Sequence, residues 1–212
     1  MTITARSGLA SMAMHVGDAL RRHGIRAVLT GGACASLHSG GAYSSVDTDF
    51  IVSGRVTQAA LDTAMASVGF RRRGDRYVHP RVRFYVEFPR GPLAVGRDYR
   101  VTPVDHRRGS ARALVLSPTD SCRDRLAAFY HWSDRQSLAV AVAIALRHRI
   151  KLDVIRRWSV GEGAAARFEE FLAARRTARR RRSRRTLTRS ARQAASARGA
   201  GRARRGGRRR GD

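Results

Sequence analysis

The sequence predicts an α+β fold, in which a mixed β-sheet flanked by helices is followed by a helical subdomain and a disordered basic tail. Over residues 1–116, some segments have apolar residues at helical spacing, and others have the alternation that is typical of a strand. From Ser117 onward only the helical period continues, and from about Ala173 apolar periodicity disappears. We therefore expect an α/β domain over residues 1–116, a helical subdomain over 117–172 and a disordered tail over 173–212.

The first part is expected to begin with a helix and then to alternate short strands with helices. Apolar residues at helical spacing predict an amphipathic helix over residues 7–22. Strict alternation of apolar and polar residues from Val82 to Phe88 predicts a half-buried strand, and the Gly74-Asp75 turn before it predicts a hairpin. The other expected elements are strands at 25–30, 49–53, 70–73, 76–79, 99–104 and 112–116 and helices at 33–38 and 58–68.

The second part is expected to be helical. Ser117-Pro118-Thr119-Asp120 is typical of a helix start, with Thr119 or Asp120 as the N-cap. Three or four helices follow, at roughly 120–131, 134–148, 152–158 and 162–174. This part holds a dense polar and aromatic cluster for which two interpretations stay open. The cluster either contacts a nucleotide or an acceptor, or it forms a seam of ion pairs and aromatic rings between helices. We favour the seam. The members of the cluster are Asp124, Arg125, His131, Trp132, Asp134, Arg135 and Gln136.

The charge of the chain is strongly positive and unevenly placed. The formal net charge is +27, and residues 173–212 hold 17 arginines and one acid, Asp212. An arginine-rich arm binds polyphosphate through counterion release, so RNA or another nucleic acid is an expected partner of residues 173–212. The arginine content is also compatible with the arginine-favouring codons of a GC-rich genome, or with a change of reading frame near the end of the gene, and both alternatives stay open.

Cysteine use and hydropathy indicate a cytoplasmic protein. Cys34 and Cys122 are far apart and form no CxxC spacing, so neither a disulfide scaffold nor a zinc site is expected. Asp18 and alternating small residues do not fit a signal peptide. The apolar run from Ala139 to Leu146 is far shorter than the roughly 20 residues that span a bilayer, so no membrane partner is expected.

Two short motifs carry the functional prediction. A strand-like run ends at the glycine pair Gly31-Gly32, ahead of an expected helix, and glycines at such a turn let backbone N–H groups approach a phosphate. Asp47 and Asp49 then stand at i and i+2 of an extended segment, so their carboxylates point the same way. Paired carboxylates beside a phosphate-binding turn predict a site for a nucleoside triphosphate with Mg²⁺ or Mn²⁺.

Further residues are expected to complete this site. Glu87 lies on the polar face of the strong strand at 82–88 and is the best candidate for a third carboxylate, as a metal ligand or as a base. Ser44 and Ser45, just ahead of the aspartates, would add hydroxyl donors. Arg83 shares the face of Glu87 and would contact phosphate.

The order of these parts resembles the nucleotidyltransferase superfamily, which has the DNA polymerase β-like fold. In that family a glycine pair after the first strand is followed by an Asp-x-Asp or Asp-x-Glu motif and by a third acid from a later strand. The matching positions here are Gly31, Gly32, Asp47, Asp49 and Glu87. The segments 86–93, 117–120, 124–132 and 134–136 resemble a group of small bacterial nucleotidyltransferase-like proteins, and the likeness covers roughly residues 7–172.

The resemblance implies a magnesium-dependent nucleotidyltransferase that moves a nucleoside monophosphate from a triphosphate to a hydroxyl acceptor. Asp47, Asp49 and Glu87 would be catalytic and hold the metal, while Gly31 and Gly32 would seat the phosphates. Two alternatives stay open. One is a catalytically weak or inactive protein of this fold that binds nucleic acid through its basic tail. The other is the toxin of a toxin–antitoxin pair, with an antitoxin-type protein as its partner.

Overall fold

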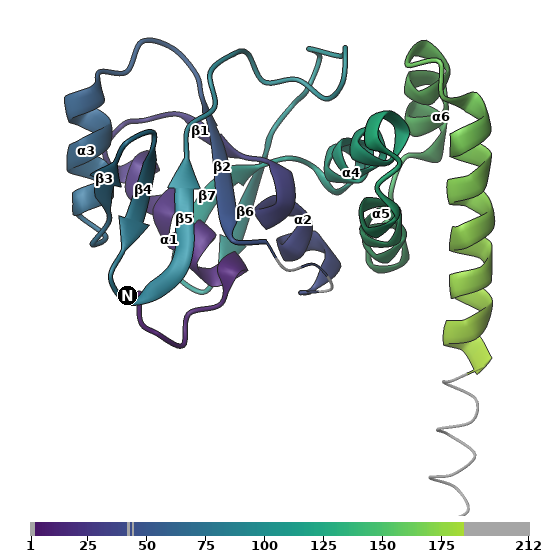
Figure 1. Cartoon of the computed structure of the whole chain (residues 1–212), viewed down its shortest axis with the longest axis horizontal. Helices are drawn as coiled ribbons and strands as arrows, with labels where there is room; N and C mark the ends of the chain where they lie inside the picture. The colour runs from purple at the N-terminus through teal and green to yellow at the C-terminus, as the bar shows by residue number, and fades with distance from the viewer. Residues whose placement is uncertain (1–2, 42, 44, 185–212) are drawn as a thin grey trace, which may run out of the picture. The chain divides into compact units, whose positions relative to one another are not determined.

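The computed structural model of the chain describes residues 3–41, 43 and 45–184 (Figure 1). The named helices are α1 (Leu9–Arg22), α2 (Gly31–Ser39), α3 (Gln58–Ala66), α4 (Pro118–Trp132), α5 (Arg135–Arg147) and α6 (Leu152–Gly161). A further helix covers residues 165–184. The strands are β1 (Ala27–Leu29), β2 (Asp47–Val52), β3 (Arg71–Arg73), β4 (Arg76–His79), β5 (Val82–Glu87), β6 (Val104–Arg108) and β7 (Ala111–Val115).

The fold is α+β, as the sequence predicts, and its sheet is mixed. Seven strands lie in the order β3-β4-β5-β2-β1-β7-β6. The central strand β2 runs parallel to β5 and antiparallel to β1, and β1 runs parallel to β7. The antiparallel hairpins β3–β4 and β6–β7 form the two ends of the sheet. The two strands that carry the predicted acidic residues are therefore neighbours, although about thirty residues separate them in sequence.

One face of the sheet is covered by α1 and α3 (Figure 1). The apolar stripe of α1 is buried, and a Cβ at Gly17 would overlap Ala113 of β7 and touch the Phe50 ring of β2. From α3, Gln58 and Asp62 are hydrogen-bonded to Tyr77 of β4. Side chains of β2 alternate between the faces, so Phe50 marks the face that these two helices bury, and its sequence neighbours point the other way.

The helical part joins the sheet mainly through helix α2 (Figure 1). Helix α2 is almost wholly buried and contacts both α4 and α5, which pair closely with each other. The α4 helix begins at Ser117, whose Oγ accepts a hydrogen bond from the Asp120 N–H at 3.1 Å, so the N-cap is Ser117 and neither Thr119 nor Asp120. Residues Met1–Phe171 form one compact unit, which includes both the sheet and the helices α4 to α6.

Two further expectations of the sequence analysis are wrong. No described strand covers residues 99–103, and β6 begins at Val104, because the chain before it turns back at a Val95–Asp98 bridge. The disordered tail expected from residue 173 is helical to residue 184 in the structure. Arginine and alanine are both good helix formers, so this run needs no apolar periodicity to adopt a helix. Residues 185–212 lie outside the described part of the chain.

A candidate acidic site between the central strands and helix α4

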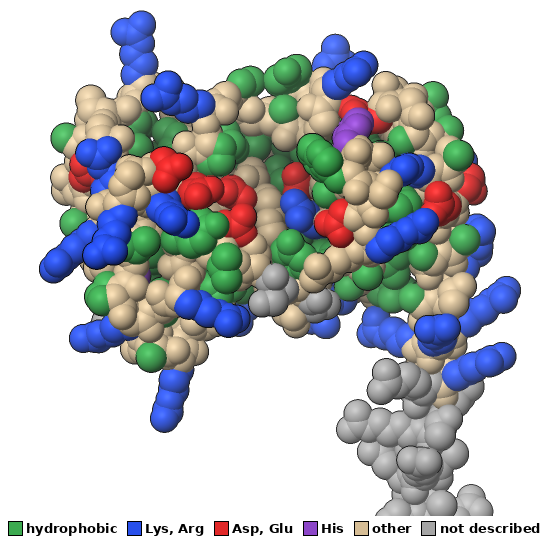
Figure 2. Space-filling view, in the orientation of Figure 1, with side chains coloured by type: hydrophobic (Ala, Val, Ile, Leu, Met, Phe, Trp, Pro, Cys, Tyr) green, Lys and Arg blue, Asp and Glu red, His purple; other side chains and the backbone are tan. Residues whose placement is uncertain are grey.

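Strand register brings the three predicted carboxylates to one face of the sheet. Asp49 of β2 is the register partner of Glu87 of β5, and Asp47 is the partner of Tyr85. Partners in neighbouring strands point to the same side, and so do residues at i and i+2. Asp47, Asp49 and Glu87 therefore share the face opposite α1 and α3, which we call the acid face. Figure 2 shows acidic side chains gathered beside a hollow on this side of the molecule.

Asp49 lies at the centre of this group. Burial, together with the negative charges of Asp47 and Glu87, raises the pKa of Asp49 from an ordinary value of 3.8 to about 6. A partly buried acid with two like-charged neighbours is costly for the fold. Such a cluster is typical of a site whose charge a bound cation neutralises.

Gly31 places the start of α2 directly against Asp49. The backbone of Gly31 has a φ of +60°, and a Cβ at this position would overlap the Asp49 Oδ2 atom. The Thr30 N–H, one residue earlier, donates to the Asp49 carbonyl oxygen at 2.9 Å. The first N–H groups of a helix have no partners within the helix, so the N-terminus of α2 offers free donors beside the acids. Backbone donors and carboxylates thus lie together.

Gly32 lets the following loop close over the same helix start. A Cβ at Gly32 would overlap the Tyr43 ring and the Ser45 side chain. The Ser45 hydroxyl donates a hydrogen bond to Asp47 Oδ1, so Ser45 serves a carboxylate directly. Ser44, the other serine that the sequence favours, lies outside the described residues.

Helix α4 contributes two residues, Asp124 and Arg125, for which the sequence analysis left contact with a nucleotide open but favoured a seam between helices. Asp124 and Arg125 form an ion pair of 2.7 Å, and both are close enough to Asp49 to influence its pKa, Asp124 raising it and Arg125 lowering it. The Arg125 guanidinium also lies 5.8 Å from the centre of the Tyr43 ring. The sequence shows that Asp124 and Arg125 are adjacent in a polar helix, but it does not show which side of α4 faces the sheet.

Arg83 lies on the acid face but at a distance from its centre. It precedes Glu87 by four residues, which corresponds to roughly 13 Å along a strand. Its guanidinium lies against the Phe84 ring, with Cζ 5.5 Å from the ring centre. Arg83 thus belongs to the surface around the acids, whereas Arg125 is the arginine beside Asp49.

The donor set suits a hard divalent cation. Carboxylate oxygens are the side-chain ligands that Mg²⁺ prefers. Burial is the largest cause of the raised pKa of Asp49, and the neighbouring acids add to it. Among the described residues, no three or more side chains of His, Cys, Asp or Glu lie together in an arrangement that could hold a metal ion. The hydrogen bond from Ser45 turns Asp47 toward the loop. The chemistry of the residues therefore fits a cation, with fewer than three protein ligands in this arrangement.

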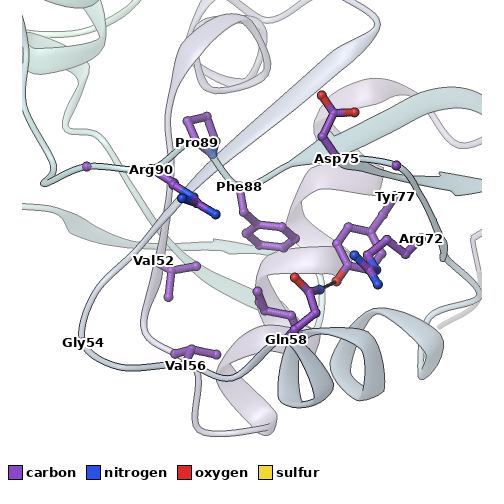
Figure 3. Close-up of a pocket in the computed structure, with 13 residues that line it drawn as sticks. Val52, Gly54, Val56, Gln58, Arg72, Asp75, Tyr77, Phe88, Pro89 and Arg90 are labelled. Carbon is purple, nitrogen blue, oxygen red and sulfur yellow. Dashed lines mark hydrogen bonds between the residues drawn. The ribbon is translucent and has the colours of Figure 1, made fainter.

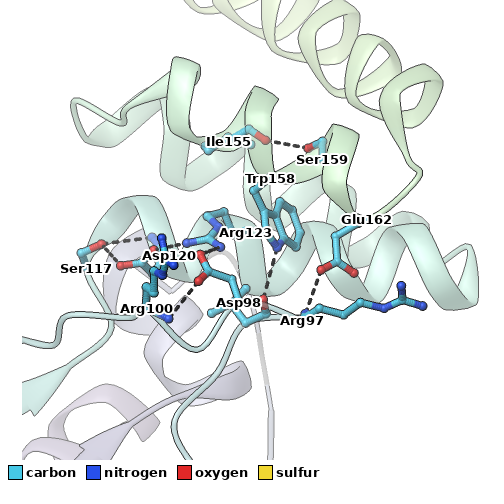
Figure 4. Close-up of polar contacts among 11 residues, drawn as sticks. Arg97, Asp98, Arg100, Ser117, Asp120, Arg123, Ile155, Trp158, Ser159 and Glu162 are labelled. Carbon is cyan, nitrogen blue, oxygen red and sulfur yellow. Dashed lines mark hydrogen bonds and ion pairs between the residues drawn. The ribbon is translucent and has the colours of Figure 1, made fainter.

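The segment between β5 and β6 forms ion pairs and hydrogen bonds with the helical part, and these contacts fix the position of α4 (Figure 4). The buried Arg123 guanidinium bonds Asp98 of this segment at 2.5 Å and Asp120 of its own helix at 2.9 Å. The Trp158 indole N–H of α6 donates to the Val95 carbonyl oxygen, and Glu162 accepts from the Arg97 N–H at 2.8 Å. Because Arg123 immediately precedes Asp124 and Arg125, this anchor sets which residues α4 turns toward the acid face.

A separate cavity of about 610 Å³ lies on the other side of the same strands (Figure 3). Phe88 and Val52 line it, and both belong to the face that α3 covers. Gln58 donates to the Tyr77 hydroxyl at 2.7 Å along its wall. Neither Asp47, Asp49 nor Glu87 lines this cavity, so it is distinct from the acidic site.

We expect Gly31→Ala to destabilise the protein and disrupt the acidic site. The new Cβ would overlap the Asp49 carboxylate, in addition to the cost of about 1 kcal/mol for a side chain at positive φ. The free energy of unfolding should fall by about 2–3 kcal/mol, measured by urea denaturation. Gly109→Ala is the matched control, because Gly109 has a φ of +59° and no atom within 4 Å of its added Cβ. Equal losses in both variants would contradict the close contact.

Comparison with family models, curated proteins and solved structures found no match to this chain. Among the described residues, no helix combines the length and the apolar character that a membrane span requires.

Proposed function

We propose that this chain is a magnesium-dependent nucleotidyltransferase that moves a nucleoside monophosphate from a triphosphate to a hydroxyl acceptor. The supporting observation is the register of β2 and β5, with Asp49 beside Glu87 and with Gly31 packed against the Asp49 carboxylate. The order of strand, glycine turn, helix, paired aspartates and later acid resembles the DNA polymerase β-like superfamily, and the mixed sheet with helices is compatible with that fold.

Each group on this face has a role in that reaction. The free N–H groups at the start of α2, from Gly31 and Gly32, bind the triphosphate, because a helix N-terminus attracts anions. Arg125 of α4 supplies positive charge close enough to lower the pKa of Asp49. Tyr43 and Ser45 pack over the helix start, and the Ser45 hydroxyl donates a hydrogen bond that holds Asp47 in place.

Asp47, Asp49 and Glu87 are the residues that would hold Mg²⁺ or Mn²⁺, although the three side chains of the described structure are not grouped to ligate one ion together. When bound, the cation supplies charge neutralisation for the leaving pyrophosphate and lowers the pKa of the acceptor hydroxyl. Glu87 is the last residue of β5, so it is the carboxylate we assign to receive the proton of the acceptor hydroxyl. The bond from the α-phosphorus to the acceptor oxygen forms as the bond to pyrophosphate breaks.

The test is transfer of label from α-labelled triphosphates, with all four bases and with RNA 3′ ends, small hydroxyl compounds and the protein itself as acceptors. Full-length protein with magnesium should label at least one acceptor, and Asp47→Asn/Asp49→Asn should not. Asp75→Asn is the control, because Asp75 is an exposed acid in the turn between β3 and β4. Equal labelling by the wild type and the double variant, zero included, would contradict the proposal.

A further inference from the structure

The acid face continues into an arginine-rich surface across β5, β4 and β3. Three residues follow one another across these strands. Arg76 of β4 is the register partner of Glu87 of β5, and Arg73 of β3 is the register partner of Arg76. Together with the partner pair of Asp49 and Glu87 they form one row on one face. The row runs from two exposed arginines to two acids over three strand spacings, roughly 14 Å.

A second row lies beside the first and contains an aromatic ring. Arg71 pairs with Val78, Val78 with Tyr85, and Tyr85 with Asp47. The Arg76 guanidinium lies over the Tyr85 ring, with Cζ 4.9 Å from the ring centre. The half-exposed ring and the arginines therefore form one surface, which we call the arginine–tyrosine surface: Arg71, Arg73, Arg76 and Tyr85.

In the described part of the chain, the arginines of this surface form no ion pair, although Glu87 is the strand neighbour of Arg76. Among the described residues, the structure gives no ion pair to Arg71, Arg73 or Arg76, whereas Arg72, on the opposite face, approaches Asp62 at 3.6 Å. Figure 2 shows basic side chains over the β3–β5 part of the molecule, next to the acidic ones. Three unpaired guanidinium groups on a short hairpin repel one another, so the surface is suited to a polyanion.

We infer that the arginine–tyrosine surface binds a single-stranded polynucleotide and directs its end toward the acids. Guanidinium groups bind the phosphates, and the Tyr85 ring provides a face on which an unpaired base stacks. A duplex hides its base faces, so the aromatic ring favours a single strand over a double helix. Asp49 and Glu87 stand at the end of the same row as Arg73 and Arg76, so we place the terminal hydroxyl of the strand, which carries no further phosphate, over these two acids.

This inference rests on the proposed function only where it names the bound strand as the acceptor. The binding of the strand does not depend on the proposed function. It assigns nucleic-acid binding to described residues of the sheet, separate from the arginines of residues 173–212. Because the arginines of residues 173–212 would also attract a polyanion, the experiment compares variants that keep these residues unchanged.

The test is fluorescence anisotropy of a labelled twelve-nucleotide oligo(A) RNA with the full-length protein, in EDTA and without triphosphate. For Arg73→Gln/Arg76→Gln, the slope of log affinity against log salt should become shallower by about 1.4, because each phosphate contact to a single strand contributes roughly 0.7. The matched control is Arg107→Gln/Arg108→Gln, an exposed pair on β6 at the other end of the sheet, and it should leave the slope unchanged. Thermal unfolding verifies that each variant is folded.

A second comparison isolates the aromatic contact. Tyr85→Ala should weaken binding about tenfold and Tyr85→Phe should not, because stacking needs the ring and not the hydroxyl. Unchanged affinity and slope in the arginine and Tyr85→Ala variants would overturn the inference, and a sheet control that weakens binding equally would do the same. The binding assay needs no nucleotide transfer, so the two tests are independent. A failure to bind RNA would leave the proposed transfer activity open to its own test, and a failure to transfer label would leave the RNA-binding result unchanged.

Discussion

Asp49→Asn is expected to abolish nucleotide transfer while making the protein more stable at neutral pH. The substitution removes a carboxylate from the centre of the acidic site, and we expect activity to fall about a thousandfold. The same change removes a charge that the fold holds at a cost, since burial and the charges of Asp47 and Glu87 raise the pKa of Asp49 to about 6. Loss of activity together with a gain of stability is the signature of a functional residue held under electrostatic strain.

The pH dependence of this stability difference follows from the direction of the pKa shift. The folded protein holds the Asp49 proton up to about pH 6, whereas the unfolded chain releases it near the ordinary value of 3.8. Proton binding therefore stabilises the wild type at low pH, and this contribution is lost as the pH rises through 6. The variant should match the wild type below pH 4 and exceed it by about 1–2 kcal/mol above pH 6, a figure reduced for solvent screening.

Urea denaturation between pH 4 and pH 8 measures this difference, with Asp75→Asn as the control for the loss of one exposed negative charge. The control should neither stabilise the protein nor change its activity. A variant at Asp49 that is less stable than the wild type at pH 7, with full activity, would show that the carboxylate is an ordinary stabilising group.

Arg123→Met is expected to cause the largest loss of stability of any arginine substitution considered. The Arg123 side chain is 2% exposed, lies 5.0 Å from the Trp158 ring centre and pairs with both Asp98 and Asp120. Methionine fills part of the volume but leaves two carboxylates without their partner. We expect the free energy of unfolding to fall by about 3–4 kcal/mol.

The matched control is Arg112→Met. Arg112 makes two hydrogen bonds to Asp105, of 3.0 and 2.8 Å, but these side chains are 42% and 51% exposed. An exposed pair is worth less than about 1 kcal/mol, so the same substitution should cost little there. Similar losses in both variants would contradict the role we assign to the buried anchor between α4 and the segment before β6.

The Arg123 effect should also depend on pH in a known direction. The Arg100 backbone N–H and the Arg123 guanidinium hold the pKa of Asp98 below its ordinary value, although burial opposes them. The stability that Asp98 contributes is therefore present above the unfolded pKa and is lost as the pH falls through the folded one. The difference between the wild type and Arg123→Met should shrink on acidification below pH 4, which urea denaturation at each pH measures.

Local rules were sufficient for much of the sheet. Alternation with period two placed Glu87 on the polar face of its strand, and the Gly74-Asp75 turn predicted the hairpin of β3 and β4, which the structure confirms. The expected strand at 49–53 begins at Asp47 in the structure, so both aspartates belong to the strand itself. Spacing within one strand sets which way two carboxylates point, and that much can be derived from sequence.

Contacts between distant segments were not available from local rules. Nothing in the residues of β2 and β5 shows that these strands pair. The expectation that Glu87 joins the aspartates came from the usual need of a metal site for a third carboxylate and from the resemblance. The expected strand at 99–104 was wrong because the buried anchor of Arg123 and Asp98 holds the preceding chain in a turn. Asp124 and Arg125 were missed as site residues because only the packing of α4 decides which of its polar side chains meet the acids.

The most direct measurement of the central claim is equilibrium binding of a triphosphate to the full-length protein, with and without magnesium. The account predicts that ATP or another triphosphate binds at 150 mM salt only when Mg²⁺ is present, and that Asp49→Asn and Gly31→Ala each abolish this magnesium-dependent binding. Electrostatic binding to the basic residues needs no cation and is unaffected by either variant, so it is measured in the same titration. Binding that is the same with and without magnesium, or unchanged in Asp49→Asn, would contradict the claim that the acid face is a cation-dependent nucleotide site.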